Sequence, residues 1–320
     1  MKRLLIAALA WATSTSALAQ DYPAKPIRLI IPYAAGSVAE VLFRGLMPVL
    51  EPRLGQRFIV DARPGADGNI GMAEAARSAP DGYTLVLAPT ANFAVLDHLA
   101  KDLPFNALTS FDPICMIAET WPLATVGPNV PARTMKELAD YVKANPGKYN
   151  YGSQGTGSPT HLIGAAFSQL NGNSMVHIPY KGTPPMITAM LSGDIQVTFA
   201  SMTAVLPQLK AGKLRALAVM GRNRQPELPD LPTTVEAGFP QLVMSNWWVV
   251  AGPKGTPARA VERMSSELRS ALQDTDVRKR YADVGHIPVG MTPSETATFL
   301  KTESARYKGI VEAGNIKLEQ

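Results

Sequence analysis

Glycines and hydroxyl side chains are concentrated in residues 151–161, whose sequence is Tyr-Gly-Ser-Gln-Gly-Thr-Gly-Ser-Pro-Thr-His. A short predicted strand precedes them, and Ser158 followed by Pro159 is typical of an N-cap and the first helical position. The glycines let the backbone approach a guest, Ser153, Thr156 and Ser158 supply hydroxyls, and the helix start presents unpaired N–H groups. This chemistry suits an anion. The alternative is a glycine-rich connection that only caps a helix.

The common phosphate-binding and nucleotide-binding loops do not match this segment. No Gly-Lys-Ser or Gly-Lys-Thr follows the glycines, and their spacing is Gly-x-x-Gly-x-Gly instead of Gly-x-Gly-x-x-Gly. Nucleotide binding is therefore disfavoured, and a small carboxylate is the simpler guest.

The side chains that support catalysis or metal binding are sparse. The four histidines show no His-x-x-x-His spacing, and Gly-x-Ser-x-Gly is absent, so we expect no metal, no cofactor and no common hydrolase elbow. A catalytic triad assembled from distant residues stays open. We expect His161 to be structural or to contact the ligand. Lys181 follows Tyr180 at a strand end and either pairs with an anion or is a solvated turn residue.

Two more loops follow predicted strands. Residues 33–37 join a strand at 27–32 to a helix, where Ser37 and Glu40 fit a capping box, and residues 89–93 follow a strand at 84–88. Parallel sheets bind ligands beyond the carboxyl ends of their strands, so we expect these loops to converge on one crevice. The residues predicted to contact the ligand are Tyr33, Ala35, Gly36, Ser37, Val38, Thr90, Ala91, Asn92, Phe93, Ser153, Thr156, Gly157, Ser158, Thr160, His161, Tyr180, Lys181, Ser201 and Trp247.

Strands alternate with helices along most of the chain, which predicts an α/β fold with parallel sheets. Two apolar, β-prone segments, 111–126 and 242–250, interrupt this alternation and suit crossings between two domains. We therefore expect residues 20–121 and 247–320 to form a split domain 1, and residues 122–246 to form domain 2, with the two crossing strands as a hinge. Pro48 should kink or end the helix that contains it.

The amino terminus has the pattern of a secretory signal. Lys2 and Arg3 precede an apolar run, and Ala17-Leu18-Ala19 is a small-x-small site, so we expect residues 1–19 to be removed. The single cysteine excludes an internal disulfide. Because no cysteine lies near the predicted cleavage site, we expect no lipid anchor. The net charge of +5 over 320 residues comes without a Lys/Arg cluster, so nucleic acid is not an expected partner. We expect the mature protein to be a monomer that is soluble outside the cytoplasm.

Several segments together resemble the Bug family, the extracytoplasmic solute receptors of tripartite tricarboxylate transporters, over nearly the whole mature length. No single segment is specific for this family, but the order of the segments behind a signal peptide is specific. The segments are residues 31–36, 63–66, 68–71, 80–83, 151–162, 179–182, 210–218 and 315–317.

The resemblance implies a two-lobed periplasmic binding protein, a Venus flytrap of type II, with helices flanking a mostly parallel sheet in each lobe. It implies a receptor, not an enzyme, that closes on a small carboxylate and presents it to integral membrane permease subunits. In such receptors the loops that correspond to residues 33–38 and 153–158 usually clasp a ligand carboxylate with amides and hydroxyls.

The chain departs from the family pattern at four positions. The family usually has glycine where this chain has Ser37, Asp where it has Glu40 and Gln196, and often Asp where it has Ala200. Fewer acidic groups near the crevice would suit a doubly anionic or less polar guest, and we expect a dicarboxylate, aliphatic or aromatic. Tyr33, Phe93, Tyr180 and Trp247 are the expected walls.

Two other functions stay open. One is a receptor that reports its ligand state to a two-component sensor, and the other is a secreted hydrolase or isomerase. Stoichiometric binding without turnover separates both receptors from an enzyme, and co-purification with a permease or a sensor separates the receptors from each other.

Overall fold

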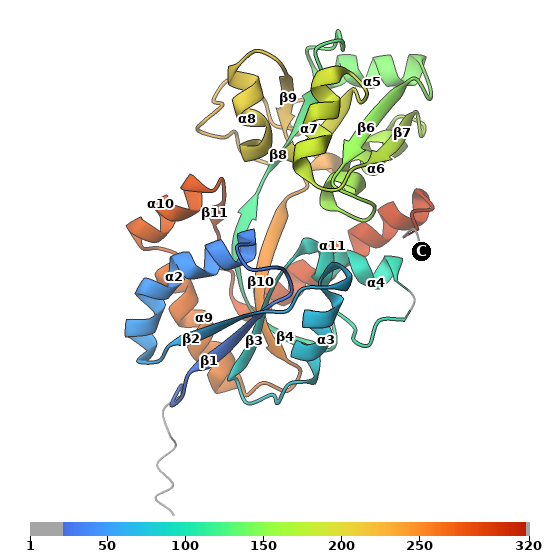
Figure 1. Ribbon diagram of the computed structural model, residues 1–320. Coiled ribbons are helices and arrows are strands. Elements are labelled where there is room, and N and C mark those ends of the chain that lie inside the picture. Colours follow the sequence, from blue (N-terminus) through green and yellow to red (C-terminus); the bar gives the residue numbers. More distant parts are fainter. Residues whose placement is uncertain (1–21, 101, 318–320) are drawn as a thin grey trace, which may run out of the picture.

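The computed structural model describes residues 22–100 and 102–317, and it has two lobes joined by extended segments (Figure 1). The predicted signal peptide lies outside the described residues. Within those residues, no helix combines the length and the apolar character needed to cross a bilayer.

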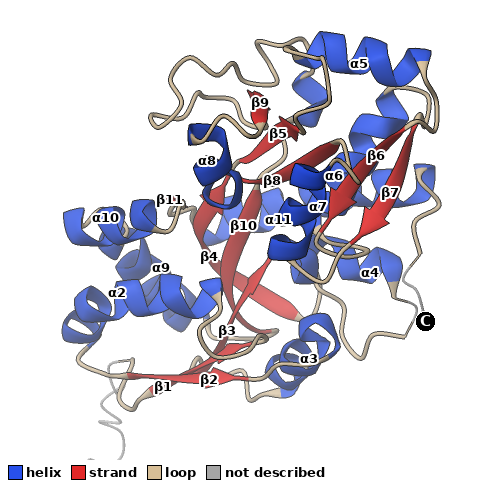
Figure 2. Ribbon diagram, turned by 45° about the horizontal axis from the view of Figure 1, so that its top comes forward, coloured by secondary structure: helices blue, strands red, loops and turns tan. Residues whose placement is uncertain are grey.

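Lobe 1 is built around a six-stranded sheet in the described part of the chain, in the order β11-β4-β10-β3-β1-β2. Helices cover both faces (Figure 2). The strands are β1 (Ile27–Ile31), β2 (Phe58–Ala62), β3 (Thr84–Pro89), β4 (Phe111–Thr120), β10 (Asn246–Pro253) and β11 (Ile287–Pro288). The helices and helical turns are α2 (Val38–Leu54), η1 (Ala66–Gly68), α3 (Asn69–Arg77), η2 (Ala91–Val95), α4 (Leu96–Leu99), α9 (Ala258–Ala271), α10 (Thr275–Asp283) and α11 (Pro293–Ala313).

Lobe 2 has a five-stranded sheet within the described residues, in the order β7-β6-β8-β5-β9. Its strands are β5 (Pro122–Val126), β6 (Tyr149–Ser153), β7 (Met175–Pro179), β8 (Val197–Ser201) and β9 (Arg215–Val219). Its helices are α5 (Met135–Ala144), α6 (Pro159–Leu170), α7 (Thr183–Ser192), α8 (Met202–Lys210) and η3 (Pro240–Leu242).

Both sheets are mixed, although most strands of each sheet run in one direction. In lobe 1, β1 pairs in parallel with β2 and β3, whereas β10 pairs antiparallel with β3 and β4. In lobe 2, β6 is parallel to β7 and β8, whereas β5 is antiparallel to β8 and β9. Each antiparallel pair includes β5, β10 or β11, which run opposite to the other strands of their sheets.

The crossings lie where the apolar segments predict them. The chain leaves lobe 1 at Trp121, between β4 and β5, and returns between β9 and β10. Helix α11 packs on β4 of lobe 1 and also contacts α6 of lobe 2, where Gln169 Nε2 donates to the Ile310 carbonyl at 2.9 Å. The boundaries at 121/122 and 246/247 fall in the crossing segments, and their status as limits of separate domains stays a prediction.

Two local expectations need correction. Helix α2 does not end early at Pro48, because it continues through Pro48 and Pro52 to Leu54. Both prolines are exposed, so water can satisfy the carbonyl groups that lose their helical partners. The loop expected at residues 89–93 is largely helical, since the π-helical turn η2 begins at Ala91.

A glycine brings the first-lobe loops together. A Cβ at Gly71 in α3 would lie 2.8 Å from Pro32 Cα and 2.9 Å from the Arg63 carbonyl oxygen. Only glycine therefore lets α3 lie against the carboxyl ends of β1 and β2. This contact fixes the positions of the loops that follow both strands.

Candidate ligand-binding cleft

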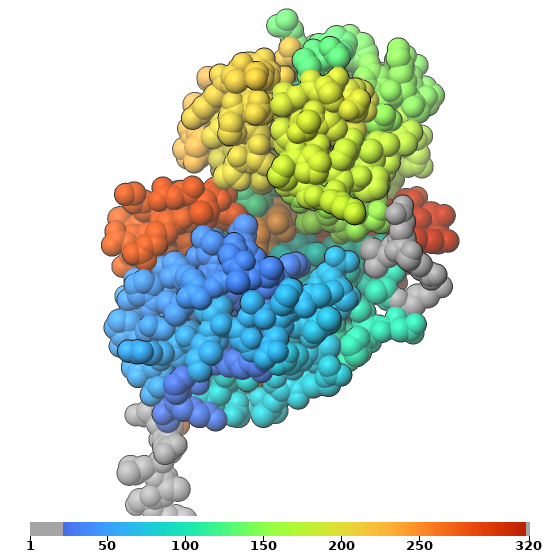
Figure 3. All heavy atoms as spheres, in the orientation of Figure 1, coloured from blue at the N-terminus to red at the C-terminus, as the bar shows by residue number. Residues whose placement is uncertain are grey.

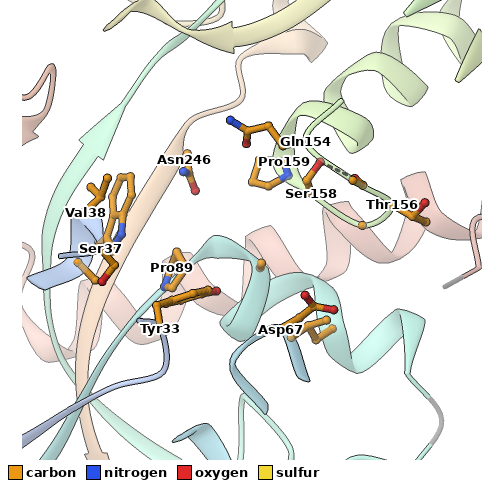
Figure 4. Close-up of a pocket in the computed structure, with 16 residues that line it drawn as sticks. Tyr33, Ser37, Val38, Asp67, Pro89, Gln154, Thr156, Ser158, Pro159 and Asn246 are labelled. Atoms are coloured by element: carbon orange, nitrogen blue, oxygen red, sulfur yellow. Dashed lines mark hydrogen bonds between the residues drawn. The ribbon is translucent and has the colours of Figure 1, made fainter. Parts of the chain in front are cut away.

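A cleft of about 370 Å³ lies between the lobes and the crossing strand β10. The surface is hollowed there, between the blue residues of lobe 1 and the yellow-green residues of lobe 2 (Figure 3). The side chains around it come from the loops after β1, β2, β3 and β6 (Figure 4). The lining residues are Tyr33, Ser37, Val38, Ala39, Asp67, Pro89, Ala91, Leu96, Gln154, Gly155, Thr156, Gly157, Ser158, Pro159, Asn246 and Trp248.

The free backbone donors of the cleft are at the start of α2. Ser37 is its N-cap, but the Ser37 side chain caps nothing, and its buried Oγ has no partner among the described residues. The first helical hydrogen bond runs from the Val41 N–H to the Ser37 carbonyl, at 3.0 Å. The N–H groups of Val38, Ala39 and Glu40 have no acceptor in the described part of the chain. Val38 and Ala39 line the cleft, so the positive end of a 17-residue helix faces it.

Glu40 closes the preceding loop. Its Oε2 accepts from the Gly36 N–H at 2.8 Å, and its Oε1 accepts from Arg44 Nε at 2.6 Å. The Gly36 N–H, followed by Arg44, lowers the pKa of this carboxyl, so it stays ionised. The predicted capping box is therefore displaced by one residue, because Glu40 reaches Gly36 instead of Ser37. The Gly36 N–H is not available to a ligand.

The loop at residues 153–158 uses most of its donors internally. The Gln154 N–H donates to Thr160 Oγ1 at 3.0 Å, and the Gly157 N–H donates to His161 Nδ1 at 3.0 Å. The Gly155 and Ser158 amides also have acceptors within the loop. Only the Thr156 and Thr160 amides lack an acceptor among the described residues, so this loop offers fewer donors than the glycines and hydroxyls suggest.

The start of α6 is capped as predicted. Ser158 is the N-cap, its Oγ accepts from the His161 N–H at 3.3 Å, and Pro159 occupies the first turn. Thr160 and His161 are buried behind the loop and support its backbone. They do not line the cleft.

Two neutral histidines stack behind this loop. The His161 and His177 rings are parallel, with centroids 3.7 Å apart, and Tyr151 stacks on His177 at 5.1 Å. Burial, then the neighbouring His177, lowers the pKa of His161 to about 3, and burial lowers the pKa of His177 to about 4. Both rings are therefore uncharged near neutral pH, and neither supplies a cation to the cleft.

Ser153 and His177 form a pair of the kind found in nucleophilic enzymes, but its surroundings do not suit catalysis. Ser153 Oγ lies 2.6 Å from His177 Nε2. The serine is completely buried and also exchanges hydrogen bonds with the Gly155 backbone. Because a substrate has no access to the Ser153 Oγ, this pair is structural. The prediction that the Ser153 hydroxyl faces the cleft is wrong.

The third predicted loop mainly supports other residues. Thr90 Oγ1 accepts from the Trp247 N–H at 3.0 Å. Asn92 Oδ1 accepts from the Tyr33 hydroxyl at 2.6 Å, and its Nδ2 donates to the Asp67 carbonyl at 3.0 Å. Phe93 lies in the core of lobe 1. Of this predicted group only Ala91 lines the cleft.

Trp248, not Trp247, is the tryptophan of the cleft. Successive side chains of β10 point to opposite faces, so Asn246 and Trp248 line the cleft together. Trp247 is fully buried and packs edge to face on Phe299, with centroids 5.3 Å apart. Asn246, a polar residue two positions before Trp248, was the signal in the sequence that could have identified the face of β10 that lines the cleft.

The remaining predicted contacts lie outside the cleft lining. Ala35 and Gly36 are exposed beside it, Tyr180 packs on the core of lobe 2, and Lys181 is exposed. Ser201 Oγ contacts Thr203 Oγ1 at 3.3 Å.

The departures at Gln196 and Ala200 do not concern the cleft. Gln196 lies at the amino end of β8, where its side chain accepts from the Asn150 N–H at 2.8 Å and donates to the Gly193 carbonyl at 2.7 Å. Ala200 is buried in the core of lobe 2. Neither position therefore supports the expectation that missing acidic groups near the crevice favour a doubly charged guest.

The charge in the cleft comes from one side chain. Among the described residues that line the cleft, Asp67 alone carries a formal charge, and it lies on the side of the cavity opposite Val38 (Figure 4). Its backbone has φ +53°, a conformation that non-glycine residues seldom adopt. Burial, then the Asp67 charge, raises the pKa of the Tyr33 hydroxyl, so the field of this carboxylate extends into the cleft. Within the described residues, no cluster of His, Cys, Asp or Glu side chains could hold a metal ion.

Comparison with known proteins adds a family to this geometry. A model of the tripartite tricarboxylate transporter family receptor, TctC, matches residues 42–316. The BugT protein of Bordetella pertussis is 34% identical over 302 residues, which are 94% of this chain and 93% of BugT.

Two solved structures with ligands are similar in fold and sequence. The R. palustris protein Rpa4515 with adipate has a TM-score of 0.77 and 29% identity, and the similarity covers 93% of this chain and 100% of Rpa4515. MatC from Rhodopseudomonas palustris with bound malate has a TM-score of 0.73 and 26% identity, over 91% of this chain and 100% of MatC. The predicted two-lobed binding-protein fold is thereby confirmed.

Proposed function

Because the chain belongs to the tripartite tricarboxylate transporter receptor family, we propose that it captures a small carboxylate and delivers it to the membrane subunits of such a transporter. Receptors of this family are periplasmic solute-binding proteins and not enzymes. Removal of the signal peptide and the identity of the membrane partner belong to the proposal.

The uncapped start of α2 supports the proposal most directly. Val38 and Ala39, whose N–H groups are free, line the cleft, and none of the described lining side chains carries a positive charge. A charge-assisted hydrogen bond contributes roughly 1.5 to 3 kcal/mol. Micromolar affinity needs about 8 kcal/mol after the costs of association, so the helix donors need further contacts from the second lobe.

Those further contacts are available on the opposite wall. Thr156 presents a side chain and an amide without an acceptor among the described residues, and Asn246 adds a side-chain amide from the crossing strand β10. Tyr33, Trp248 and Pro89 supply apolar surface between the polar ends. This arrangement suits a short carbon chain with a carboxylate at one end, and the volume of the cleft suits ligands of the size of malate or adipate.

A ligand panel tests the proposal. The mature protein, freed of bound ligand by unfolding and refolding, should be stabilised against heat by at least one C4 to C6 carboxylate, with stoichiometric binding in calorimetry. Mass spectrometry of the protein as first purified should identify a carboxylate. Stabilisation by neutral sugars or amines with no response to any carboxylate would reject the proposal.

Asp67 predicts a preference within that panel. A second carboxylate near this residue meets a like charge, which costs about 1 kcal/mol at partly exposed positions. The dicarboxylate expected from the sequence should therefore place its second charge away from Asp67. Replacing Asp67 by Asn, which tolerates a positive φ, should improve dicarboxylate binding about fivefold relative to monocarboxylate binding.

The matched control for this comparison is Asp140→Asn, on α5 at the outer end of lobe 2 (Figure 1). Asp140 is exposed and pairs with Lys136, so its loss should leave the ratio of the two affinities unchanged. An equal ratio in the Asp67→Asn variant and in the unmodified protein would show that Asp67 does not select the ligand.

A further inference from the structure

A second polar cavity borders the same loop as the cleft. This rear cavity has a volume of about 360 Å³, and its walls come from β6, α6, β7 and the segment after α11. Thr156 lines both cavities, so the loop at residues 153–158 separates them. The proposed function uses only the cleft and leaves the rear cavity without a role.

Two buried side chains present unused polar atoms to the rear cavity. Tyr151 and His161 are 4% and 5% exposed, and both line it. Neither the Tyr151 hydroxyl nor His161 Nε2 has a hydrogen-bond partner among the described residues. The side chains are buried as a whole, but these two atoms are not fully enclosed and are reached from the cavity, so each can bond a guest there.

The orientation of both groups is fixed. A Cβ at Gly164 would lie 2.2 Å from the Tyr151 ring, so the ring rests directly on α6. The Gly157 N–H donates to His161 Nδ1 at 3.0 Å, so the neutral ring carries its proton on Nε2. His161 therefore offers a donor to the rear cavity.

The other polar lining groups favour a negatively charged guest. Among the described residues that line the rear cavity, Lys317 alone carries a formal charge, and none is acidic. Asn173 and Gln169 add amide groups to the walls. Donors and one cation, without an acidic residue, complement a compact anion.

We propose that the rear cavity is a second ligand site that binds a compact oxyanion through the Tyr151 hydroxyl, His161 Nε2–H and Lys317. The anion lies against the loop whose opposite side faces the cleft, and it holds His161, which in turn holds the Gly157 amide. The site would therefore support the cleft loop from behind.

Titration with inorganic phosphate, observed through the imidazole resonances of the ¹⁵N-labelled mature protein, tests this site. All four histidines lie in the described residues, and His98 and His286 are internal controls because they bond to Ser304 and to the Val284 carbonyl elsewhere. The His161 and His177 resonances should shift saturably while the controls stay unchanged. Equal, non-saturating shifts of all four, or no shift, would overturn the proposal.

Matched variants identify the contacts. Tyr151→Phe removes one hydroxyl and should weaken phosphate binding about tenfold, whereas Tyr149→Phe, on the same strand but outside the cavity lining, should not. Lys317→Gln should weaken binding similarly, and Lys308→Gln on α11 should not. Unchanged phosphate affinity in both Tyr151→Phe and Lys317→Gln would contradict the assignment.

A variant in the cleft distinguishes the two sites. Val38→Glu places a negative charge at the start of α2, and Val38 is 46% exposed, so folding should be preserved. The variant should bind no carboxylate in the cleft, yet its His161 response to phosphate should remain. Loss of both the carboxylate binding and the His161 response to phosphate would mean that phosphate binds in the cleft. If no carboxylate of the panel binds but the His161 response persists, the proposed function is rejected and the rear site is retained.

Discussion

Replacing Val38 by proline is expected to weaken carboxylate binding about 10- to 100-fold while leaving the fold intact. The change removes one free N–H that lines the cleft, and a charge-assisted hydrogen bond contributes roughly 1.5 to 3 kcal/mol. Val38 is the first residue of α2, where proline is well tolerated, and Ser37 already has the extended conformation (ψ 158°) that a residue before proline prefers. Calorimetry with the carboxylate selected by the panel measures the loss.

Thr275→Pro is the matched control. Thr275 is the exposed first residue of α10, and Asp274 caps that helix through the Asp276 and Val277 amides, so the Thr275 N–H is not used. Both proline variants should unfold at or slightly above the temperature of the unmodified protein, because proline restricts the unfolded chain. Undiminished binding by Val38→Pro would show that the start of α2 does not hold the carboxylate.

Glu119→Gln is expected to make the protein less sensitive to alkaline pH. Glu119 lies in β4 beside the first crossing and is largely buried, and burial raises its pKa from 4.5 to about 7 despite hydrogen bonds with Ser245 and Trp121. The folded protein therefore holds this proton more tightly than the unfolded chain. The stability associated with the protonated form is complete below pH 4.5 and is lost as the pH rises through about 7.

The expected size of this effect is roughly 2 to 4 kcal/mol between pH 4.5 and 8. It is measured as the difference in unfolding free energy between the unmodified protein and the Gln variant across that range. The difference cancels other titrating groups, such as Glu40 and the two stacked histidines, which both proteins share. Glu227→Gln, at an exposed position, is the control. Parallel stability curves for Glu119→Gln and the unmodified protein would contradict the prediction.

Local signals in the sequence were sufficient to predict most elements and the existence of the cleft. Ser158-Pro159 marks the start of α6, Thr134 caps α5, and glycines follow several helices, because these features act within a few residues. The strand-to-helix loops at 33–38 and 153–158 do line one cavity, as parallel strands require.

Features that depend on the detailed path of the backbone and on strand pairing could not be predicted from the sequence. His161 and Thr160 turn back to bond the amides of the preceding loop, so glycine-rich composition overstated the free donors there. The face of β10 depends on its pairing with β3 and β4, which exchanged the predicted Trp247 for Trp248. Asp67 enters the cleft through an unusual turn of the backbone, which no pattern in the sequence indicates.

The positions of the tryptophans give the protein its own optical reporter. In the described part of the chain the tryptophans are Trp121, Trp247 and Trp248, and all of them belong to the segments that join the lobes. The indole of Trp248 also forms part of the cleft wall. Its fluorescence should therefore change when a guest displaces water from the cleft or the lobes rotate, so unlabelled protein can be screened against metabolite libraries.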